Sequence, residues 1–311
     1  MRPSPYPSPG VPGEGKCWSG SFMPFRQLTI LGVGLLGGSI GLASRAAIPG
    51  CRIIGCGHRR QTLERAVEIG AIDEAQLDPA AAVVGSDLVI LCTPVGLFEG
   101  MLKQIAKSLQ PGCIVTDVGS TKRSVASAAE SILPTTVDFV PSHPIAGSEK
   151  RGVEFARADL FRHGLCILTP TARTRPAATK RIEEFWKSLG MRTLHLDPPT
   201  HDRLLADISH LPHLLAAALV TMQEDAALDL CGQGFLDTTR IAGGDGVLWR
   251  DIFVDNADNL RAGVKRLKAQ LAAVISLLEP GQGEALKDWL DAAAQRRKKL
   301  LERKLREMNP D

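Results

Sequence analysis

The sequence lacks the features that would place it among secreted, metal-binding or membrane-spanning proteins. Its seven cysteines are scattered and never form a Cys-x-x-Cys pair, which argues against a disulfide framework or a zinc site and suits a reducing cytoplasm. No uninterrupted apolar run reaches the roughly 18 residues of a membrane span, because the best candidate, residues 28–43, contains five glycines. We therefore expect a cytoplasmic protein without a metal or membrane site.

Strong net charge is also missing. The formal charge is only +3, which is too small to indicate binding to nucleic acid or to a membrane surface. Basic residues do gather in residues 295–311, but glutamates alternate with them at helical spacing. This pattern is typical of a solvated helix end.

The first 24 residues are rich in proline, glycine and serine and contain no apolar core of a signal peptide. We predict that residues 1–24 form a disordered tail. The alternative is that translation begins at Met23, in which case the tail is not made.

Short apolar runs alternate with helical patterns from residue 25 onward, which predicts βαβ units and a parallel sheet. Beyond Pro198 and Pro199 the sequence reads as long helices. We predict a Rossmann-type dinucleotide-binding domain over residues 25–198 and an all-α domain over residues 199–311. Strands are expected over residues 26–34, 51–57, 86–94, 112–120, 138–144, 164–170 and 191–197, and helices over residues 36–48, 59–70, 97–109, 121–133 and 176–190.

A glycine-rich turn follows the first predicted strand. Gly32, Gly34 and Gly37 form a Gly-x-Gly-x-x-Gly motif between a strand and a helix, the context in which this motif binds a dinucleotide. The first glycine allows a tight turn, the second lets the backbone approach a pyrophosphate, and the third permits close packing of helix on strand. The amino end of the helix then faces the phosphates. The alternative is a turn that serves packing alone.

The residues after the second predicted strand bear on the choice between NAD and NADP. NAD-binding proteins usually place an acidic residue here, whereas this chain has Gly57 followed by His58, Arg59 and Arg60. A guanidinium group binds a 2′-phosphate that a carboxylate would repel. The pattern favours NADP over NAD, unless the two arginines only cap a strand at the surface.

Three histidines are candidate site residues. His143 ends a predicted strand, and ligands of open α/β sheets bind at the carboxyl ends of strands. An imidazole of ordinary pKa, about 6.5, can take a hydroxyl proton as hydride leaves the attached carbon. His210 and His213 are three residues apart and could line a cleft from one helical face. A metal site there would lack a third ligand at matching spacing.

The chain resembles the prephenate/arogenate dehydrogenase family of tyrosine biosynthesis. The segments HPIAGSE and DTTRIA are the most specific part of this similarity, which runs from about residue 28 to residue 260. It implies a nucleotide-binding domain followed by a helical domain that forms a homodimer. The matching stretches are GVGLLGGS, LCTPV, TDVGSTK, SHPIAGSEKRGVEFARADLF, HDRLLADISHLPH and GFLDTTRIAGGDGVLWRDIF.

The resemblance also implies roles for single residues. His143 would be the catalytic base, and Ser120 would bind the substrate's ring hydroxyl and the nicotinamide end of the cofactor. Arg240 would bind a substrate carboxylate, with Asp237 paired to it. Trp249 would close the pocket, from its own or the neighbouring subunit. The other implied residues are Ser209, His210 and His213 around the substrate, and Leu35, Leu36, Thr93 and Pro94 beside the cofactor.

The reaction that the resemblance implies is the oxidative decarboxylation of prephenate to 4-hydroxyphenylpyruvate. Hydride leaves ring C4 for the cofactor, His143 takes the hydroxyl proton, and carbon dioxide departs as the ring becomes aromatic. Arogenate, with an amine in place of the ketone, would give tyrosine directly. Because prephenate users in the family carry a histidine at the position of His213, we expect prephenate. The stretch GGDGVLW departs from the family pattern and leaves the loop before Trp249 open.

Two other functions fit the sequence less well. A β-hydroxyacid dehydrogenase needs a catalytic lysine on its first interdomain helix, and residues 203–220 contain none. A non-catalytic NADP(H)-binding sensor would tolerate the loss of His143, Ser120 or Arg240, yet all three are present. Both alternatives therefore rank below the dehydrogenase.

Overall fold

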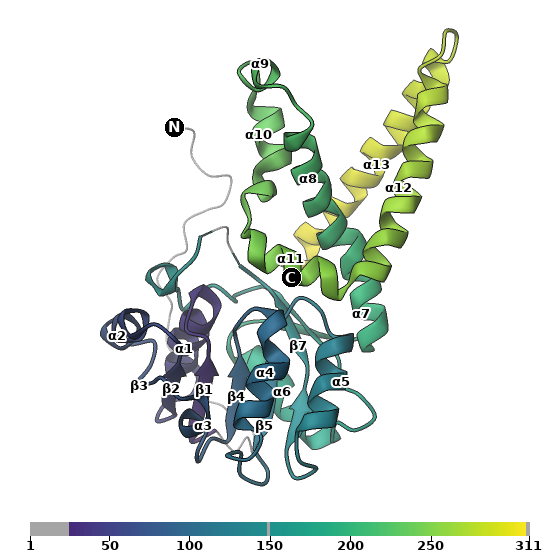
Figure 1. The fold of residues 1–311 in the computed structure, drawn as a ribbon. Coiled ribbons are helices and arrows are strands. Elements are labelled where there is room, and N and C mark those ends of the chain that lie inside the picture. Colours follow the sequence, from purple (N-terminus) through teal and green to yellow (C-terminus); the bar gives the residue numbers. More distant parts are fainter. Residues whose placement is uncertain (1–24, 148–149, 309–311) are drawn as a thin grey trace.

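The computed structural model describes residues 25–147 and 150–308. The tail predicted over residues 1–24 lies outside these described residues. Figure 1 shows a sheet flanked by helices, formed by the amino-terminal part of the chain, with the carboxyl-terminal helices standing on one edge of it.

Six parallel strands form the main sheet, in the order β3-β2-β1-β4-β5-β6. Helices supply the crossovers that parallel strands require. This arrangement confirms the predicted Rossmann-type α/β fold. β3 escapes prediction because its three residues, Glu-Ala-Gln, carry no apolar pattern. The elements are β1 (Gln27–Leu31), α1 (Leu35–Ala47), β2 (Arg52–Cys56), α2 (Arg60–Glu68), β3 (Glu74–Gln76), α3 (Pro79–Ala82), β4 (Leu88–Leu91), α4 (Phe98–Ile105), β5 (Ile114–Asp117), α5 (Arg123–Ile132) and β6 (Asp138–Val140), with a 3₁₀ turn, η1 (Val95–Leu97), before α4.

Alternate residues of the strands pack on opposite faces of the sheet. On one face Leu28 joins a cluster with Ile40 of α1 and Phe185 of α6 (Pro176–Ser188). On the other face Leu31 packs with Phe98 of α4. Each such fully buried side chain contributes about 1.5–3 kcal/mol to stability. This burial holds the strands in register, so that their carboxyl ends meet at one edge.

A second sheet has three strands in the order β7-β8-β9. β7 (Ser142–Ile145) runs antiparallel to β8 (Leu165–Leu168), which runs parallel to β9 (Arg192–His195). A 3₁₀ turn, η2 (Val153–Phe155), lies between β7 and β8. The single strand predicted over residues 138–144 is therefore wrong, because β6 and β7 belong to different sheets.

The division between β6 and β7 falls at Pro141. Proline has no N–H to donate to a strand ladder. The next N–H, that of Ser142, donates to Asp117 Oδ1 at 3.1 Å instead of to a strand. His143 consequently lies inside β7, just beyond the edge of the main sheet.

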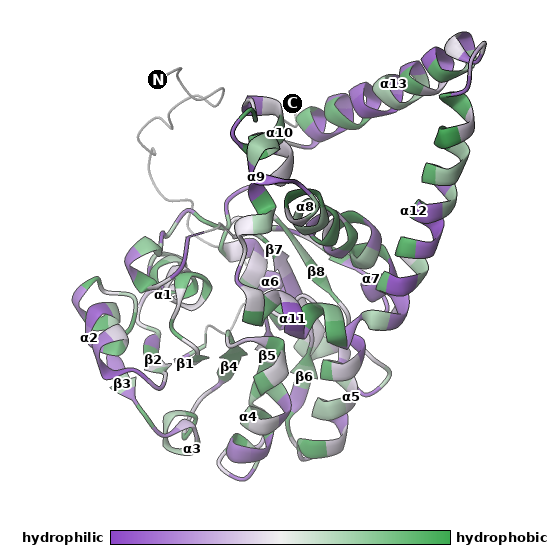
Figure 2. Cartoon of the chain, turned by 45° about the horizontal axis from the view of Figure 1, so that its top comes forward, coloured by the Kyte–Doolittle hydropathy of each residue, from purple (hydrophilic) through white to green (hydrophobic). Residues whose placement is uncertain are grey.

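The rest of the described chain, residues 198–308, is helical and contains no strand. α12 and α13 form an arm in which α12 leads away from the sheet and α13 turns back at an angle from its far end (Figure 1). Hydrophobic and hydrophilic residues alternate along both helices of this arm (Figure 2). The elements are α7 (Pro198–Leu205), the π-helical segment η3 (Ala206–His210), α8 (Leu211–Thr221), α9 (Asp225–Leu228), α10 (Gln233–Thr239), the 3₁₀ turn η4 (Arg240–Gly243), α11 (Gly246–Asp255), α12 (Ala257–Leu277) and α13 (Gly283–Met308).

Helix Pro198–Thr221, which combines α7, η3 and α8, is long and apolar enough to cross a membrane by length and composition alone. Only 22% of its most apolar window is buried within the chain. The same helix carries the fully buried polar side chains of His201 and His210, which a lipid-facing span would not hold in this way.

A buried ion pair closes the carboxyl end of β5. Lys122 Nζ donates to Asp117 Oδ2, and both side chains are fully buried. Asp117 also accepts from the N–H of Gly119 at 2.8 Å. A buried ion pair stabilises a fold only when both partners are present, because removing one leaves an uncompensated buried charge.

We predict that Asp117→Ala lowers the free energy of unfolding by about 3–5 kcal/mol, because the Lys122 ammonium would stay buried without a counter-charge. Urea unfolding followed by circular dichroism measures the loss. The Asp117→Ala/Lys122→Met double variant should recover part of it. A loss below about 1 kcal/mol in the single variant would contradict the analysis.

Candidate functional site

The glycine turn lies at the junction of β1 and β4, where the order of strands in the main sheet reverses direction. Gly32 has a φ of +102°, and a Cβ on it would lie 2.8 Å from the backbone of Cys92. A Cβ on Gly37 would lie 2.2 Å from the carbonyl oxygen of Gly32. Both positions need glycine for conformation or for space. Ligands of open α/β sheets bind at such a junction.

Gly34 differs from the other two glycines because nothing lies within 4 Å of a Cβ built on it. It is the N-cap of α1, without a side-chain cap and with no acidic residue in the first turn. The open space and the unpaired N–H groups of this helix start, beside the half-buried Leu35 and Leu36, fit a pyrophosphate. The predicted cofactor loop therefore has the shape that a dinucleotide requires.

Two further loops at the same edge carry polar groups that lack partners. The hydroxyl groups of Thr93, after β4, and Thr121, after β5, are buried and accept or donate no hydrogen bond within the described residues. Pro94 and Ser120 are half-buried beside them. Orphaned polar groups in a buried position need a ligand or water. Their position beyond the glycine turn suits the nicotinamide end of the cofactor.

His58, Arg59 and Arg60 are exposed at the start of α2, and Arg59 is its N-cap residue. Neither arginine forms an ion pair with any described residue. Both guanidinium groups therefore remain available to an anion at this end of the nucleotide site.

His143 is buried and is held in place through its neighbour Ser142. The Ser142 hydroxyl donates to the carbonyl of Asp117 at 2.6 Å and receives the indole N–H of Trp186 at 3.1 Å. Burial, together with His201, Lys122 and His210, lowers the pKa of His143 well below its ordinary value. The imidazole is therefore neutral at pH 7, as a proton acceptor must be.

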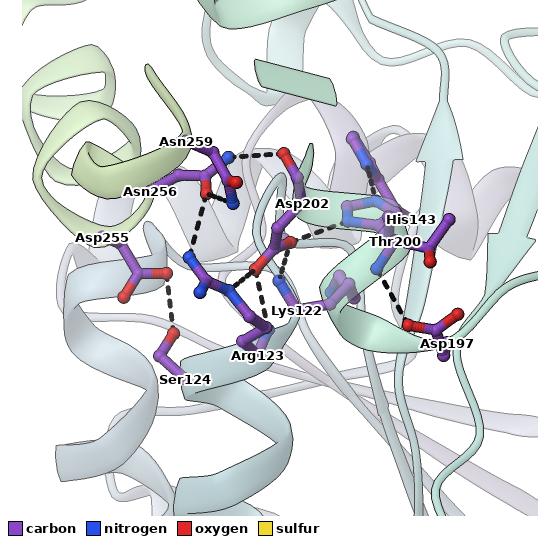
Figure 3. Close-up of polar contacts among 12 residues, drawn as sticks. Lys122, Arg123, Ser124, His143, Asp197, Thr200, Asp202, Asp255, Asn256 and Asn259 are labelled. Carbon is purple, nitrogen blue, oxygen red and sulfur yellow. Dashed lines mark hydrogen bonds and ion pairs between the residues drawn. The ribbon is translucent and has the colours of Figure 1, made fainter. Parts of the chain in front are cut away.

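A polar network that the sequence analysis did not identify lies behind His143. His143 Nδ1 is 2.9 Å from His201 Nε2, and His201 Nδ1 is 2.8 Å from Asp202 Oδ1. Asp202 also accepts from the backbone N–H groups of Lys122 and Arg123, at 2.8 and 3.0 Å. Figure 3 shows Asp202 between these residues and His143. The adjacent His-Asp pair in the sequence was the available signal, but nothing local linked it to His143.

Asn256 joins the same network from the start of α12. Its side-chain N–H group donates to the carbonyl of Asp202 at 2.7 Å and lies 3.2 Å from His210 Nδ1. Its side-chain oxygen accepts from Asn259 at 2.9 Å and from Arg123 at 3.3 Å. The amide nitrogen thus faces His210, so His210 Nδ1 accepts and Nε2 carries the proton.

The π-helical segment η3 positions the next group of predicted residues. Pro212, near the start of α8, has no N–H and crowds the carbonyl four residues earlier. The helix widens at this point, which turns His210 inward while Ser209 remains half-buried. The Nε2 atom of His210 is buried without a partner among the described residues. The site therefore offers a hydrogen-bond donor, the Nε2–H group of His210, that has no partner among the described residues.

His213 and Trp249 form the outer wall of this site. Their rings stack with centroids 3.3 Å apart and planes at 25°. Trp249 therefore contacts His213 of its own chain. Burial, and next the positive charge of Arg240, lower the pKa of His213 to about 4. His213 is thus neutral at pH 7 and close to Arg240.

Asp237 is exposed on α10 and accepts a hydrogen bond from Gln233 Nε2 at 2.8 Å. α10 ends at Thr239, and the chain continues into η4 at Arg240. The pairing of Asp237 with Arg240 stays a prediction.

The described residues contain no group of three or more histidine, cysteine or acidic side chains arranged to hold a metal ion. The histidines instead form a row from β7 to α8. His201 is linked to His210 through Asp202 and Asn256. His210 and His213 both contact Trp249, with ring centroids 6.3 and 3.3 Å away. Such a row at the carboxyl edge of the main sheet can bind a polar ring compound and accept one proton from it.

Comparison with known proteins gives two family matches and several relatives. The model of the prephenate dehydrogenase nucleotide-binding domain matches residues 40–195, and that of the prephenate dehydrogenase dimerization domain matches residues 197–292. Prephenate dehydrogenase of Bacillus subtilis is 36% identical over 75% of this chain, which spans only 65% of that protein's length. Cyclohexadienyl dehydrogenase of Zymomonas mobilis is 32% identical over 80% of this chain and 89% of its own.

Solved structures show the same similarity in three dimensions. Prephenate dehydrogenase from Aquifex aeolicus, in complex with hydroxyphenyl propionate and NAD⁺, superposes with a TM-score of 0.84 at 32% identity, covering 89% of this chain and 99% of that one. Arogenate dehydrogenase from Synechocystis superposes with a TM-score of 0.76 at 30% identity, covering 88% and 99%.

We predict that Gly34→Val weakens binding of the dinucleotide at least about tenfold, or about 1.4 kcal/mol, because the side chain would fill the space above the helix start. Fluorescence titration with NADP⁺ measures this. Gly232→Val is the matched control, since Gly232 is also an extended N-cap residue with nothing within 4 Å of its Cβ position. Unchanged affinity in Gly34→Val would show that the phosphates bind elsewhere.

Proposed function

Because the chain belongs to the prephenate dehydrogenase family, we propose that it oxidises prephenate with loss of carbon dioxide, using a nicotinamide dinucleotide as hydride acceptor. The observation that carries this proposal is the position of His143. It is a buried, neutral imidazole at the same edge of the main sheet as the glycine turn, with one ring nitrogen bound to His201. Its other nitrogen is left to act on a substrate hydroxyl.

The reaction needs a proton acceptor at the carbon that loses hydride. When bound, the nicotinamide supplies the hydride-accepting carbon. His143 would take the proton of the ring hydroxyl through Nε2, and Ser120, on the loop after β5, would hold the same hydroxyl. Once the ring carbon becomes a carbonyl, loss of carbon dioxide restores aromaticity. The protein therefore contributes mainly orientation and electrostatics.

Substrate carboxylates would be bound on the side of the helical domain. Arg240 carries the positive charge near His213, and a guanidinium group binds a carboxylate through two parallel hydrogen bonds. His210 adds its buried Nε2–H donor. Trp249, stacked on His213, would shield the ring from water, which strengthens these electrostatic interactions.

Prephenate is favoured over arogenate by the charge around His213. A ketone accepts hydrogen bonds and suits a neutral imidazole beside a guanidinium group, whereas an ammonium group would be repelled by Arg240. The low pKa of His213, about 4, keeps that side chain neutral at pH 7. Arogenate, which would give tyrosine directly, is the alternative substrate.

NADP⁺ is the cofactor that this chain's residues favour. Arg59 and Arg60 stand where NAD-binding proteins usually carry an acid, and neither is paired with a described acidic residue. The relative from Aquifex aeolicus was solved with NAD⁺. The preference for NADP⁺ is therefore a property proposed for this chain and its two arginines.

A homodimer of a cytoplasmic enzyme would account for the apolar surface of the helical domain. Leu271 and Ile275 on α12 are 55% and 63% exposed, and Leu290 and Leu305 on α13 are 53% and 57% exposed. Rows of exposed apolar side chains on two long helices mark an interface. The matching family model is that of a dimerization domain, so we propose that a second copy covers this surface.

Initial rates with prephenate and arogenate, each with NADP⁺ and with NAD⁺, test the proposed function. Absorbance at 340 nm follows the reduced cofactor, and chromatography identifies the product. We expect the highest kcat/KM with prephenate and NADP⁺ and 4-hydroxyphenylpyruvate as product. Faster turnover of arogenate would overturn the substrate assignment, and no turnover with any pair would overturn the activity.

We predict that Arg59→Ala and Arg60→Ala each raise KM for NADP⁺ by about 10–100-fold, because each removes a charged hydrogen bond to the 2′-phosphate, worth about 1.5–3 kcal/mol. KM for NAD⁺ should change less than about twofold. Arg65→Ala is the control, since Arg65 lies on the same helix and pairs with Glu68. Equal effects on both cofactors would refute a role in phosphate recognition.

A further inference from the structure

We propose that His201 and Asp202 form a proton relay with His143, in which His201 fixes the tautomer of the base and then receives its proton. This inference rests on the proposed function, because it assigns the step that follows proton uptake by His143. Both residues are buried, and the two links of the relay measure 2.9 Å and 2.8 Å.

The tautomer follows from the partners of Asp202. Burial by itself would raise the pKa of Asp202, but hydrogen bonds from His201 and from the backbone of Arg123 and Lys122 lower it. Asp202 is thus a carboxylate and can only accept hydrogen bonds. The proton between Asp202 and His201 therefore belongs to His201 Nδ1.

The rest of the relay is then determined. When neutral His201 carries its proton on Nδ1, its Nε2 atom is unprotonated and can only accept a hydrogen bond. His143 Nδ1, 2.9 Å away, is therefore the protonated nitrogen of that ring. This leaves His143 Nε2 unprotonated, which is the state that a general base needs. His201 thus selects the reactive tautomer of His143, as a carboxylate does directly in many hydrolases.

The relay also determines where the positive charge goes. The substrate hydroxyl proton forms a bond to His143 Nε2, while the Nδ1–H bond of His143 breaks and an N–H bond forms at His201 Nε2. No proton is lost or gained in the pair of rings beyond the one taken from substrate. His143 ends neutral, and the imidazolium of His201 lies against the carboxylate of Asp202.

The charges around the two rings favour this outcome. Around His143, burial and the groups that face it, His201, Lys122 and His210, all act against a positive charge. Around His201, burial and Lys122 act against a positive charge, but Asp202 and Asp117 favour it. Negative groups that can stabilise a positive charge therefore lie near His201 and not near His143. Arg123 does not cancel Asp202, because its guanidinium group also pairs with Asp258, at 2.6 Å.

Asp202 is held in position by the helix that it caps. Lys122 is the N-cap residue of α5 and Arg123 its first helical residue, and both direct their N–H groups at the Asp202 carboxylate. The positive end of the helix dipole stabilises a carboxylate there. The relay therefore spans the contact between α5 of the nucleotide domain and α7 of the helical domain.

His201→Gln tests the relay, because glutamine can still accept the hydrogen bond from His143 but cannot take a proton. We expect kcat to fall by about 10–100-fold, with KM for prephenate within about twofold of the wild-type value. The acidic limb of the kcat/KM profile should move to lower pH, since the proton that inactivates the wild-type pair settles on His201, whereas the variant has only the less basic His143.

His195→Gln is the matched control, because His195 is an exposed histidine at the end of β9 that pairs with Glu183. It should leave kcat and the pH profile unchanged. A His201→Gln variant with wild-type kcat would overturn the relay. A loss of activity without movement of the acidic limb would show that His201 acts through packing alone.

A second measurement needs neither turnover nor a variant that folds. ¹⁵N NMR of histidine-labelled wild-type protein without substrate should show His143 protonated at Nδ1 and bare at Nε2 at neutral pH. On acid titration His201 should become charged before His143. The opposite tautomer, or earlier protonation of His143, would refute the relay. The expected tautomer without turnover of prephenate would instead refute the proposed substrate.

Discussion

The carboxylate of Asp202 is the group on which the arrangement of the site depends. It accepts the N–H groups at the start of α5, pairs with Arg123 and receives His201 Nδ1. A buried carboxylate without these donors would cost several kcal/mol. With them it joins the two domains, determines the tautomer of His201, and through His201 directs His143. The contact between the two domains and the orientation of the proposed base therefore depend on the same Asp202 carboxylate.

The site exists only where the two domains meet. The nucleotide domain supplies the glycine turn, Ser120 and His143, and the helical domain supplies His210, His213 and Trp249. Hydride transfer to a nicotinamide needs a dry space in which a proton acceptor stays neutral. Burial, with His201, Lys122 and His210 nearby, keeps His143 uncharged there.

The sequence alone predicted the features that depend on local pattern. The glycine turn, the alternation of strands and helices and the position of His143 near the sheet edge were all readable from short stretches. His201, Asp202 and Asn256 were not, because their roles come from contacts between segments more than 50 residues apart. The division between β6 and β7 at Pro141 was not predicted for a related reason. The N–H of Ser142 donates to Asp117, which is 25 residues away, instead of to a strand. The role of Asp237 beside Arg240 comes from the resemblance alone and stays a prediction.

For α12 and α13 the sequence predicts the helices, but the single chain does not explain what covers their exposed face. The sequence beyond Pro199 predicts long helices correctly, but apolar residues of α12 and α13 such as Leu271 and Leu290 are exposed within one chain. The single chain therefore explains the chemistry of the site better than it explains the stability of the arm. A second copy would bury what one chain exposes.

A crystal structure of the protein with NADP⁺ and 4-hydroxyphenylpyruvate tests the central claim most directly. The claim is that His143 Nε2 is the base that acts on the ring hydroxyl. We expect the 4-hydroxyl to lie within hydrogen-bond distance of His143 Nε2, about 2.6–3.2 Å, with His201 still bound to Nδ1. A ring hydroxyl bound by another residue, with His143 turned away from it, would show that His143 is not the base.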